Sequence, residues 1–386
     1  MPFLISDLAA GLGIGAIGEI TKRTLGYQDP KSDSGLIKNP LLSEANANRI
    51  VETLCKVRGA ALKIGQMLSL MDETIISPEL QRVFERVRQS ADFMPTWQME
   101  QVMRQELCDN WKDKFELFET KPFAAASIGQ VHRGVLKDGT EVAIKIQYPG
   151  VADGIESDIK NLTSVLKVAN LLPEGLFIEN IMRYARKELA WEVDYIREAE
   201  CARRFRELIT KHLPDENFYV PKVIDELSTQ KVFTSELISG VPVDKLDTIQ
   251  GITQEAKDDV SRRIMKLCLK ELFEFRYMQT DPNWSNFFYD PQSKTIYLLD
   301  FGAAREYSKE FVDKYMKVIH AASLQDKDAV MKSSLEIGFL TGFEAKQFER
   351  AHIDSVLILG EAFSTDGKFD FGTQNTTKRI HELMPV

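Results

Sequence analysis

The sequence predicts an α+β protein of two lobes, preceded by a helical extension. A chain of 386 residues exceeds what one hydrophobic core usually supports, so more than one compact part is expected. Short apolar runs separated by turn residues begin at Pro122 and predict a small β-rich lobe, with helical apolar spacing on either side. The expected parts are a glycine-rich apolar segment over 1–25, a polar linker over 26–41, a helical extension over 42–118, a β-rich N-lobe over 119–240 and a helical C-lobe over 241–386.

The composition is that of a globular protein with a negative net charge. Hydrophobic residues make up 44% of the chain and charged residues 28%, with a formal charge of -9. That charge argues against nucleic acid as a partner, because phosphate backbones are bound by clustered basic residues. The four cysteines lie far apart and the five histidines are scattered. This pattern argues against a zinc site and favours buried thiols in a reducing compartment.

The glycine-rich segment over 1–25 matches the glycine spacing of a dinucleotide-binding loop and that of a helix-packing pair. Gly13, Gly15 and Gly18 match the spacing of a dinucleotide fingerprint, but no strand precedes them, so we reject that function. Gly11 and Gly15 form a GxxxG pair, and the apolar run is shorter than the roughly 20 residues that span a bilayer. We expect a segment that associates with a membrane surface or packs on a partner, with this pair available for a homodimer. The competing interpretation is an exposed remnant of a longer precursor. No presequence is visible, and any targeting peptide is expected to have been removed.

The extension is expected to begin with a long helix capped by Ser43. On this helix Lys63 and Gln66 are three residues apart and share a face, with Gly65 beside them. Glycine inside a helix costs about 1 kcal/mol relative to alanine, so close approach of another backbone would explain it. From periodicity alone, a merely solvated face is the competing interpretation.

The strands expected after Pro122 have the order of a β-sheet that covers a bound nucleotide. Phe123–His132 and Glu141–Gln147 are joined through Asp138-Gly139, a strong hairpin signal. Lys145 ends the Val-Ala-Ile-Lys of the second run and would place a point charge on phosphate oxygens. Small residues let the preceding loop approach those oxygens, and they are Ala124, Ala125, Ala126 and Ser127. A solvent-facing strand lysine is the alternative, and the acids downstream argue against it.

Helices are expected next, over about 151–171 and 178–209. A lysine buried near phosphates needs a carboxylate partner to set its position. The second helix offers several acids, namely Glu188, Glu192, Asp194, Glu198 and Glu200. Spacing alone does not choose among them.

The C-lobe is expected to follow two further strands, over 220–227 and 232–238. A helix over about 254–277 carries an apolar stripe, which is typical of core packing. After Asp300-Phe301-Gly302 the chain is expected to enter a helix almost directly. The chain stops at Val386 without an obvious cap, so a truncated C-terminus is expected.

Two acids and an amide stand at the ends of short apolar runs in the C-terminal half. Asp281 precedes Asn286 by five residues, and Asp300 closes an Ile-Tyr-Leu-Leu strand. Asp290-Pro291-Gln292-Ser293 is turn chemistry, so the two runs are expected to form a hairpin that presents the three side chains together. Phosphoryl transfer needs such a set, with one acid to orient a hydroxyl and an amide and a second acid to hold magnesium.

These residues, in this order, resemble the protein-kinase-like fold, and finer motifs resemble the UbiB family of atypical kinase-like (ADCK) proteins. Lys63-Ile64-Gly65-Gln66 is similar to the family's KxGQ motif. The run Ala124–Ser127 resembles its Ala-rich loop, and Glu192-Val193-Asp194 resembles its ExD motif. The resemblance covers nearly the whole chain and looks closest to the mitochondrial branch required for coenzyme Q biosynthesis. It implies a bilobal protein-kinase-like fold with a family-specific N-terminal extension.

The resemblance also implies roles for single residues. Lys145 would contact phosphates with Glu198 as its partner, and Asp281 would be the catalytic acid. The metal ligands would be Asn286 and Asp300. The cover over the site would be held by Lys63, Gly65 and Gln66 of the extension with Glu192 and Asp194.

The same comparison shows departures from protein kinases. Thr280 stands where an arginine is usual, and Asn283 replaces a lysine that neutralises transferring charge. No Ala-Pro-Glu and no room for an activation loop follow Gly302. Peptide phosphorylation is therefore not expected.

The implied function is an ATP- or ADP-binding, Mg²⁺-dependent atypical kinase or ATPase that supports coenzyme Q biosynthesis. Its acceptor would be water or a small or lipid-like molecule. The implied location is the mitochondrial inner membrane, and the implied partners are a lipid surface, a quinone precursor and coenzyme Q biosynthetic enzymes. A pseudokinase scaffold switched by nucleotide is the alternative, and a protein kinase acting in trans is a third.

Overall fold

The computed structural model describes most of the chain after the linker. The described residues are 44–55, 59, 61, 63, 86–87, 93–168, 178–281, 283–364 and 367–383. The expectations for the glycine-rich segment, Ser43, Gly65 and Gln66 lie outside them. The chain divides into two compact units, each described by itself below. The first comprises residues 1–252 and 283–303, and the second comprises residues 253–282 and 304–386.

A five-stranded antiparallel sheet forms the centre of the first unit. Its strands are β1 (Phe115–Phe118), β2 (Ala124–Ala125), β3 (Gly129–Leu136), β4 (Glu141–Gln147) and β6 (Val232–Glu236). The order is β1-β3-β4-β6, with β2 paired to β3. The predicted β3–β4 hairpin is confirmed, and its turn is stabilised where Asp138 accepts a hydrogen bond from the Thr140 amide at 2.9 Å. Gly139 has a φ of +85°, which glycine adopts without steric cost.

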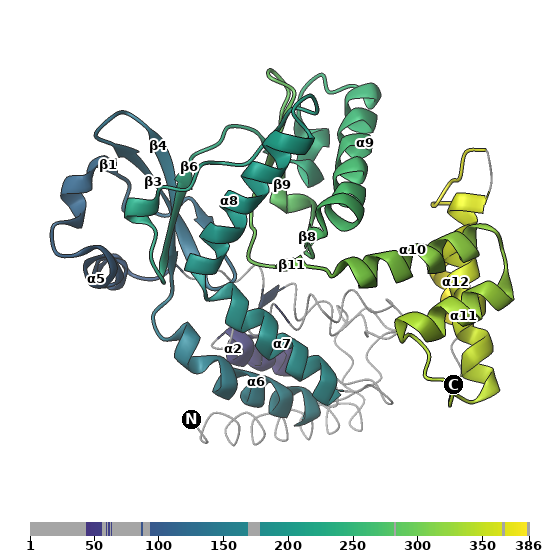
Figure 1. The fold of residues 1–386 in the computed structure, drawn as a ribbon. Helices are drawn as coiled ribbons and strands as arrows, with labels where there is room; N and C mark the ends of the chain where they lie inside the picture. The colour runs from purple at the N-terminus through teal and green to yellow at the C-terminus, as the bar shows by residue number, and fades with distance from the viewer. Residues whose placement is uncertain are drawn as a thin grey trace, which may run out of the picture. The chain divides into compact units, whose positions relative to one another are not determined.

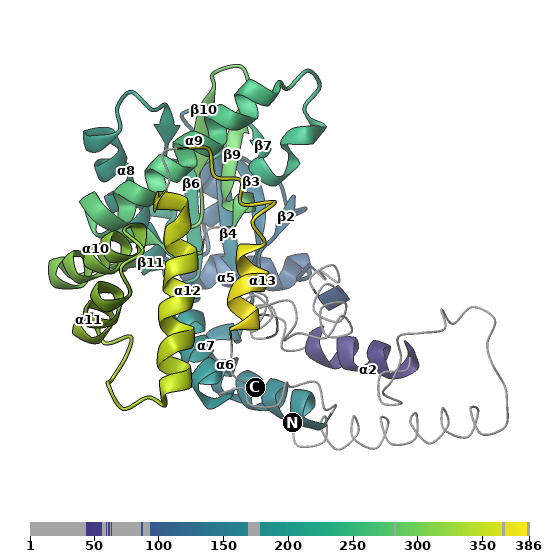
Figure 2. The same ribbon diagram turned by 90° about the vertical axis from the view of Figure 1, so that its right-hand side faces the viewer.

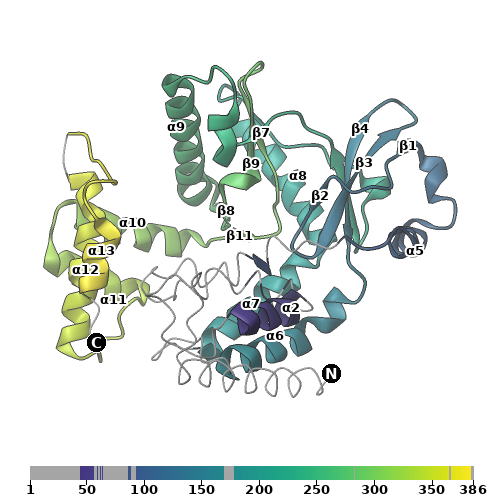
Figure 3. The same ribbon diagram turned by 180° about the vertical axis from the view of Figure 1, so that it is seen from behind.

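The alternation of side chains along β4 separates the two faces of this sheet. Val142, Ile144 and Ile146 are buried in a cluster with α5 (Thr96–Leu107), on one face. Lys145 has the opposite parity and faces α8 (Tyr195–His212). Figure 1 and Figure 3 show α5 and α8 on opposite sides of the sheet.

The helices of the first unit differ from the prediction at one point that matters. Other helices described in this unit are α2 (Glu44–Cys55), α6 (Val151–Val168) and α7 (Ile178–Glu192). The single helix expected over 178–209 is wrong, because the chain breaks after Glu192 and α8 starts anew at Tyr195. Asp194 causes the break by capping α8, since its side chain accepts a hydrogen bond from the Arg197 amide at 3.1 Å.

A second, small sheet of the first unit has the order β5-β10-β9-β7. Its strands are β5 (Phe218–Tyr219), β7 (Val241–Pro242), β9 (Phe287–Asp290) and β10 (Thr295–Leu298). The predicted β9–β10 hairpin is confirmed. The strand expected over 220–227 is wrong, because Pro221 has no amide hydrogen for a ladder and residues 225–227 form a 3₁₀ turn instead.

The second unit is largely helical. A helix, α9 (Gln254–Lys270), continues as a π-helical turn (Glu271–Phe275), so the expected helix ends before Tyr277. The strand β8 (Tyr277–Gln279) pairs with β11 (Ala304–Glu306), which separates Gly302 from the next helix. The helices described after it are α10 (Lys309–Ser323), α11 (Lys327–Ile337), α12 (Lys346–Ser364) and α13 (Thr376–Glu382), and Figure 2 shows them side by side. None of the helices described in either unit is both long and apolar enough to cross a bilayer.

Gly360 marks a close helix crossing in the second unit and supports a stability prediction. A Cβ at this position would lie 2.5 Å from the carbonyl oxygen of Ala322 on α10. We expect Gly360→Ala to lower the free energy of unfolding by about 1–3 kcal/mol, because backbone cannot move aside as a side chain can. Gly367→Ala is the control, since a Cβ there meets no atom within 4 Å. Thermal unfolding measures both variants, and equal melting temperatures would contradict the prediction.

Candidate active site

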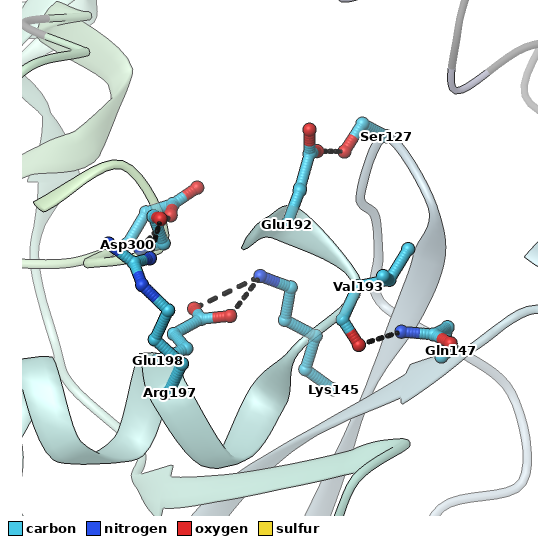
Figure 4. A network of polar contacts seen from close by, with 9 residues as sticks. Ser127, Lys145, Gln147, Glu192, Val193, Arg197, Glu198 and Asp300 are labelled. Atoms are coloured by element: carbon cyan, nitrogen blue, oxygen red, sulfur yellow. Dashed lines mark hydrogen bonds and ion pairs between the residues drawn. The ribbon is translucent and has the colours of Figure 1, made fainter. Parts of the chain in front are cut away.

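Lys145 projects from β4 on the face of the sheet that α8 covers, and it is paired with an acid. Its Nζ lies 3.0 Å and 3.1 Å from the two carboxylate oxygens of Glu198 on α8 (Figure 4). The lysine side chain is 16% exposed and that of Glu198 is 4% exposed, so the solvent-facing alternative for Lys145 is excluded. Of the acids that the sequence left open, the structure therefore brings Glu198 to the lysine.

The aromatic ring of Tyr195 also contacts the ammonium group of Lys145. Its ring centroid lies 4.9 Å from the Lys145 Nζ, and the residue is fully buried. The aromatic face attracts the ammonium group electrostatically. Tyr195 is the first residue of α8, so the cap at Asp194 also places this ring. Sequence reasoning missed Tyr195, because a contact between β4 and the start of α8 leaves no local pattern.

The charges of this pair depend on burial and on their neighbours. Burial raises the pKa of Glu198 to about 7, while Lys145 acts to lower it. Burial alone would lower the pKa of Lys145, but Glu198, Tyr195 and Asp300 raise it well above its usual range. The lysine is therefore charged at neutral pH, and its ammonium group opposes the protonation of Glu198 that burial favours.

The hairpin β9–β10 brings two predicted metal ligands to one end. Phe287 is opposite Leu298, and the next amide, that of Leu299, donates to the Asn286 carbonyl oxygen at 2.9 Å. Asp300 follows at once, with an exposed side chain and with electrostatic influence on both Lys145 and Glu198. Asn286 and Asp300 are thus neighbours in the first unit, as the turn chemistry predicts for these two, while Asp281, the third residue of the predicted set, belongs to the second unit.

The chemistry of this donor set suits a hard cation. A carboxylate and an amide oxygen are ligands that Mg²⁺ accepts, and Mg²⁺ usually completes its shell with waters and substrate phosphates. Among the residues described there is no cluster of three or more His, Cys, Asp or Glu side chains with metal-binding geometry. A cation at Asn286 and Asp300 would therefore need further ligands from a phosphate or from water. The residues fit such a shared site.

The Ala-rich loop is tied to the end of α7. The Ala126 amide donates to the Gly129 carbonyl at 2.9 Å, which closes the loop. The Ser127 hydroxyl donates to a carboxylate oxygen of Glu192 (Figure 4). A Cβ on Gly129 would lie 2.4 Å from the Ile146 carbonyl oxygen, so only glycine fits where the loop joins β3. The Ala-rich loop is therefore held by Glu192 of the Glu192-Val193-Asp194 motif, which lies far from the loop in the sequence.

The extension contacts the same region through Lys63 and a glycine. The Lys63 Nζ lies 3.3 Å from Glu188 on α7, with both side chains largely buried, and it also acts electrostatically on Glu192. A Cβ on Gly59 would lie 2.8 Å from a methyl carbon of Ile128, so the extension helix lies close to the end of the loop there. A helix-interior glycine is the signal that could have found Gly59, as it drew attention to Gly65.

The two acids of the Glu192-Val193-Asp194 motif have different contacts. Glu192 accepts from Ser127, whereas Asp194 caps α8 and accepts from the Gln230 side chain at 3.3 Å. The direct ion pair that the structure shows for Lys63 is with Glu188, which the resemblance did not single out. A salt bridge between Lys63 and either motif acid is not among the contacts described.

Asp281 lies in the second unit, directly after β8. Its amide donates to the side-chain oxygen of Gln279 at 3.2 Å, and the Gln279 amide donates to the Glu271 carboxylate at 3.1 Å. Glu271 is 4% exposed, so a buried acid anchors the segment that presents Asp281. Sequence reasoning missed Glu271, although it is four residues after Leu267 on the apolar stripe of α9, and a charged residue in such a stripe is a recognisable signal.

Glu271 supports a prediction about stability and pH. Burial raises the pKa of Glu271 from about 4.5 to about 8, although the Gln279 amide acts to lower it. Between these values the folded state binds one more proton than the unfolded chain, so stability falls as pH rises through this window. We expect Glu271→Gln, which stays neutral and keeps an acceptor oxygen, to exceed the wild type in stability at pH 9 by on the order of 3 kcal/mol, and to match it near pH 4.5.

Melting temperatures across pH 4.5–9 measure the difference. Glu274→Gln is the control, because Glu274 is exposed on the same segment and pairs with Lys270 at 2.6 Å. Its difference from the wild type should be small, since exposed pairs contribute little. A Glu271→Gln difference that does not grow with pH would contradict a protonated, buried Glu271.

Comparisons with known proteins agree on one family. A model of the ABC1 atypical kinase-like domain matches residues 86–334. The protein "Atypical kinase COQ8B, mitochondrial" of Danio rerio is 58% identical over 380 residues, covering 98% of this chain and 60% of its own length. The protein of the same name in Rattus norvegicus is 54% identical over 379 residues, covering 98% of this chain and 70% of its own. The chain thus spans part of the length of each relative.

A solved structure, that of Rv3197 with erythromycin from Mycobacterium tuberculosis, is similar in fold. The TM-score is 0.53 and the identity is 24%, over 87% of this chain and 90% of that one. At this identity the similarity concerns the fold alone.

Proposed function

The chain belongs to the ABC1 atypical kinase-like family, and we propose that it binds ATP or ADP with Mg²⁺ and transfers a phosphoryl group to water or to a small or lipid-like acceptor. Family membership agrees with the resemblance that the sequence motifs indicated, and it supports a kinase-like fold. The single observation that supports the activity best is the buried pair of Lys145 and Glu198 beside Asp300.

The residues of the first unit account for nucleotide binding. Lys145, held in place by Glu198 and Tyr195, offers its ammonium group to phosphate oxygens. The small residues Ala124–Ser127 let the loop backbone come close to the same phosphates. Asn286 and Asp300 would hold Mg²⁺, which when bound neutralises phosphate charge.

Asp281 is proposed as the acid that orients the attacking water or hydroxyl group. A carboxylate in this role accepts a hydrogen bond from the nucleophile and receives its proton. The Asp281 amide is held by Gln279, and Gln279 is held by Glu271, so the acid follows a fixed strand end. Such positioning supplies much of the rate enhancement in phosphoryl transfer.

Two features of the described residues favour a non-peptide acceptor. Asn283 stands at the position of a charge-neutralising lysine, and its side chain is engaged locally, accepting from the Ser285 amide at 3.0 Å. The strand β11 (Ala304–Glu306) and helix α10 (Lys309–Ser323) follow Gly302 at once, which leaves little chain for an activation loop. A peptide platform of the protein-kinase kind is therefore not expected.

The biological setting is proposed from the relatives. The matched proteins of zebrafish and rat carry "mitochondrial" in their names, and the sequence motifs resemble the coenzyme Q branch of the family. We extend both to this chain, with the inner membrane as the site of action. A quinone precursor, membrane lipid and coenzyme Q biosynthetic enzymes are the proposed partners, together with self-association through Gly11 and Gly15.

The proposal predicts separate effects for three substitutions. Lys145→Met and Asp300→Asn should weaken Mg²⁺-nucleotide binding by at least about 10-fold, because charge-assisted contacts are lost. Asp281→Asn should bind nucleotide normally and lose about 100-fold or more of turnover. Binding is measured by calorimetry, and turnover by phosphate release with and without anionic liposomes.

Asp290→Asn is the matched control for this set. It makes the same chemical change at the opposite end of the same hairpin, where Asp290 accepts from the Ser293 hydroxyl in the turn. Its binding and turnover should equal those of the wild type. Undiminished turnover in folded Asp281→Asn would remove the catalytic role of Asp281. Binding without turnover in the wild type, with and without liposomes, would instead support a nucleotide-switched scaffold.

A further inference from the structure

The backbone of Gly302, in the first unit, is held at both its amide and its carbonyl group. Its amide donates to the Asp300 carboxylate at 3.2 Å, and its carbonyl oxygen accepts a hydrogen bond from the Arg197 guanidinium. The Asp300 carboxylate, which is proposed to bind Mg²⁺, is therefore oriented by a turn at Gly302. Arg197 of α8 holds the carbonyl group of this turn.

This turn needs support from outside itself. Asp300 has a φ of +60°, in the left-handed region that costs a residue with a Cβ on the order of 1 kcal/mol. A local hydrogen bond to the aspartate side chain offsets part of that cost. Phe301 is buried, and its ring centroid lies 5.0 Å from that of Phe205, also on α8. One helix thus holds this turn at two successive residues, Phe301 and Gly302.

Arg197 is itself held in a defined orientation. The guanidinium carbon lies 4.6 Å from the Trp191 ring centroid on α7, and the Lys187 Nζ lies 4.8 Å from the same ring. The Arg197 backbone amide is fixed by the Asp194 cap. A planar guanidinium can stack on a ring and still donate at its edge, which a lysine ammonium cannot do in the same way.

We propose that Arg197 is a positioning residue that sets the Asp300 carboxylate for a Mg²⁺-nucleotide by holding the Gly302 carbonyl. The inference deepens the proposed function and rests on it. Arg197 acts through Gly302 and the left-handed turn, and Trp191 keeps its guanidinium in place. The helix that supplies Glu198 to the phosphate-contacting lysine thereby also orients the metal-binding acid.

The test separates binding of nucleotide from binding of the metal. Arg197→Met keeps much of the side-chain volume but removes the donor. We expect the Mg²⁺ concentration for half-maximal ATP binding by the full chain to rise about 10-fold, since a charge-assisted hydrogen bond that orients a ligand is lost. ATP binding in EDTA should stay within about 2-fold of the wild type, because Lys145 is untouched.

Two further variants make the result specific. Arg197→Lys keeps the charge, serves if the methionine variant fails to fold, and should show a smaller rise in the required Mg²⁺. Lys187→Met removes the other cation from the Trp191 ring without touching Gly302, and should match the wild type. Equal weakening with Mg²⁺ and in EDTA, or no change in either, would overturn the role of Arg197.

Amide hydrogen exchange tests the same contact without any ligand. Exchange of the amides of residues 300–303 should accelerate about 10-fold in Arg197→Met, while those of the β9–β10 strands keep the wild-type rate. Unchanged exchange at Gly302 would overturn the inference even if nucleotide binds. If the wild type binds no nucleotide, the proposed function fails, and exchange at Gly302 still decides whether Arg197 holds the turn.

Discussion

The first unit depends on the buried ion pair between Lys145 and Glu198. Both side chains are largely removed from water, and removing one partner of such a pair typically costs 3–5 kcal/mol because it leaves an unpaired charge. The pair also joins a strand to a helix that no backbone hydrogen bond connects. Its contribution is therefore positional, because it fixes the ammonium group that is proposed to contact phosphate.

The two helices on either side of the break at Glu192 contact several segments that are distant in sequence. Because α7 ends at Glu192, that carboxylate can accept from Ser127 of the Ala-rich loop. One helical turn earlier, Glu188 pairs with Lys63 of the extension. After the break, α8 presents Glu198 to the lysine and Arg197 to the Gly302 carbonyl. The loop and the extension are thus attached to α7, and the turn at Asp300 is attached to α8.

The second unit determines the position of the Asp281 backbone. A strand end alone would leave this backbone free to move, and the hydrogen bonds through Gln279 to Glu271 restrict it. Glu271 is buried and keeps its proton near neutral pH, so it anchors the segment without adding a negative charge.

The sequence by itself determined the elements whose signals are local. Turn residues at 138–139 and 290–293 specify the two hairpins, and the second of these places Asn286 and Asp300 together whatever surrounds them. The motifs, in their order along the chain, indicated the family and the kinase-like fold. Tertiary structure decided what depends on contacts across long separations, namely Glu198 as the partner of Lys145, Glu188 as the partner of Lys63, and Arg197 as the donor to Gly302. Periodicity predicted one helix over 178–209, because it depends on the spacing of apolar residues alone. It does not reveal that the Asp194 side chain accepts a hydrogen bond from a backbone amide and so starts a new helix. That hydrogen bond at Asp194 ended the helix, and the direction that α8 then takes is set by packing, which spacing along a chain does not encode.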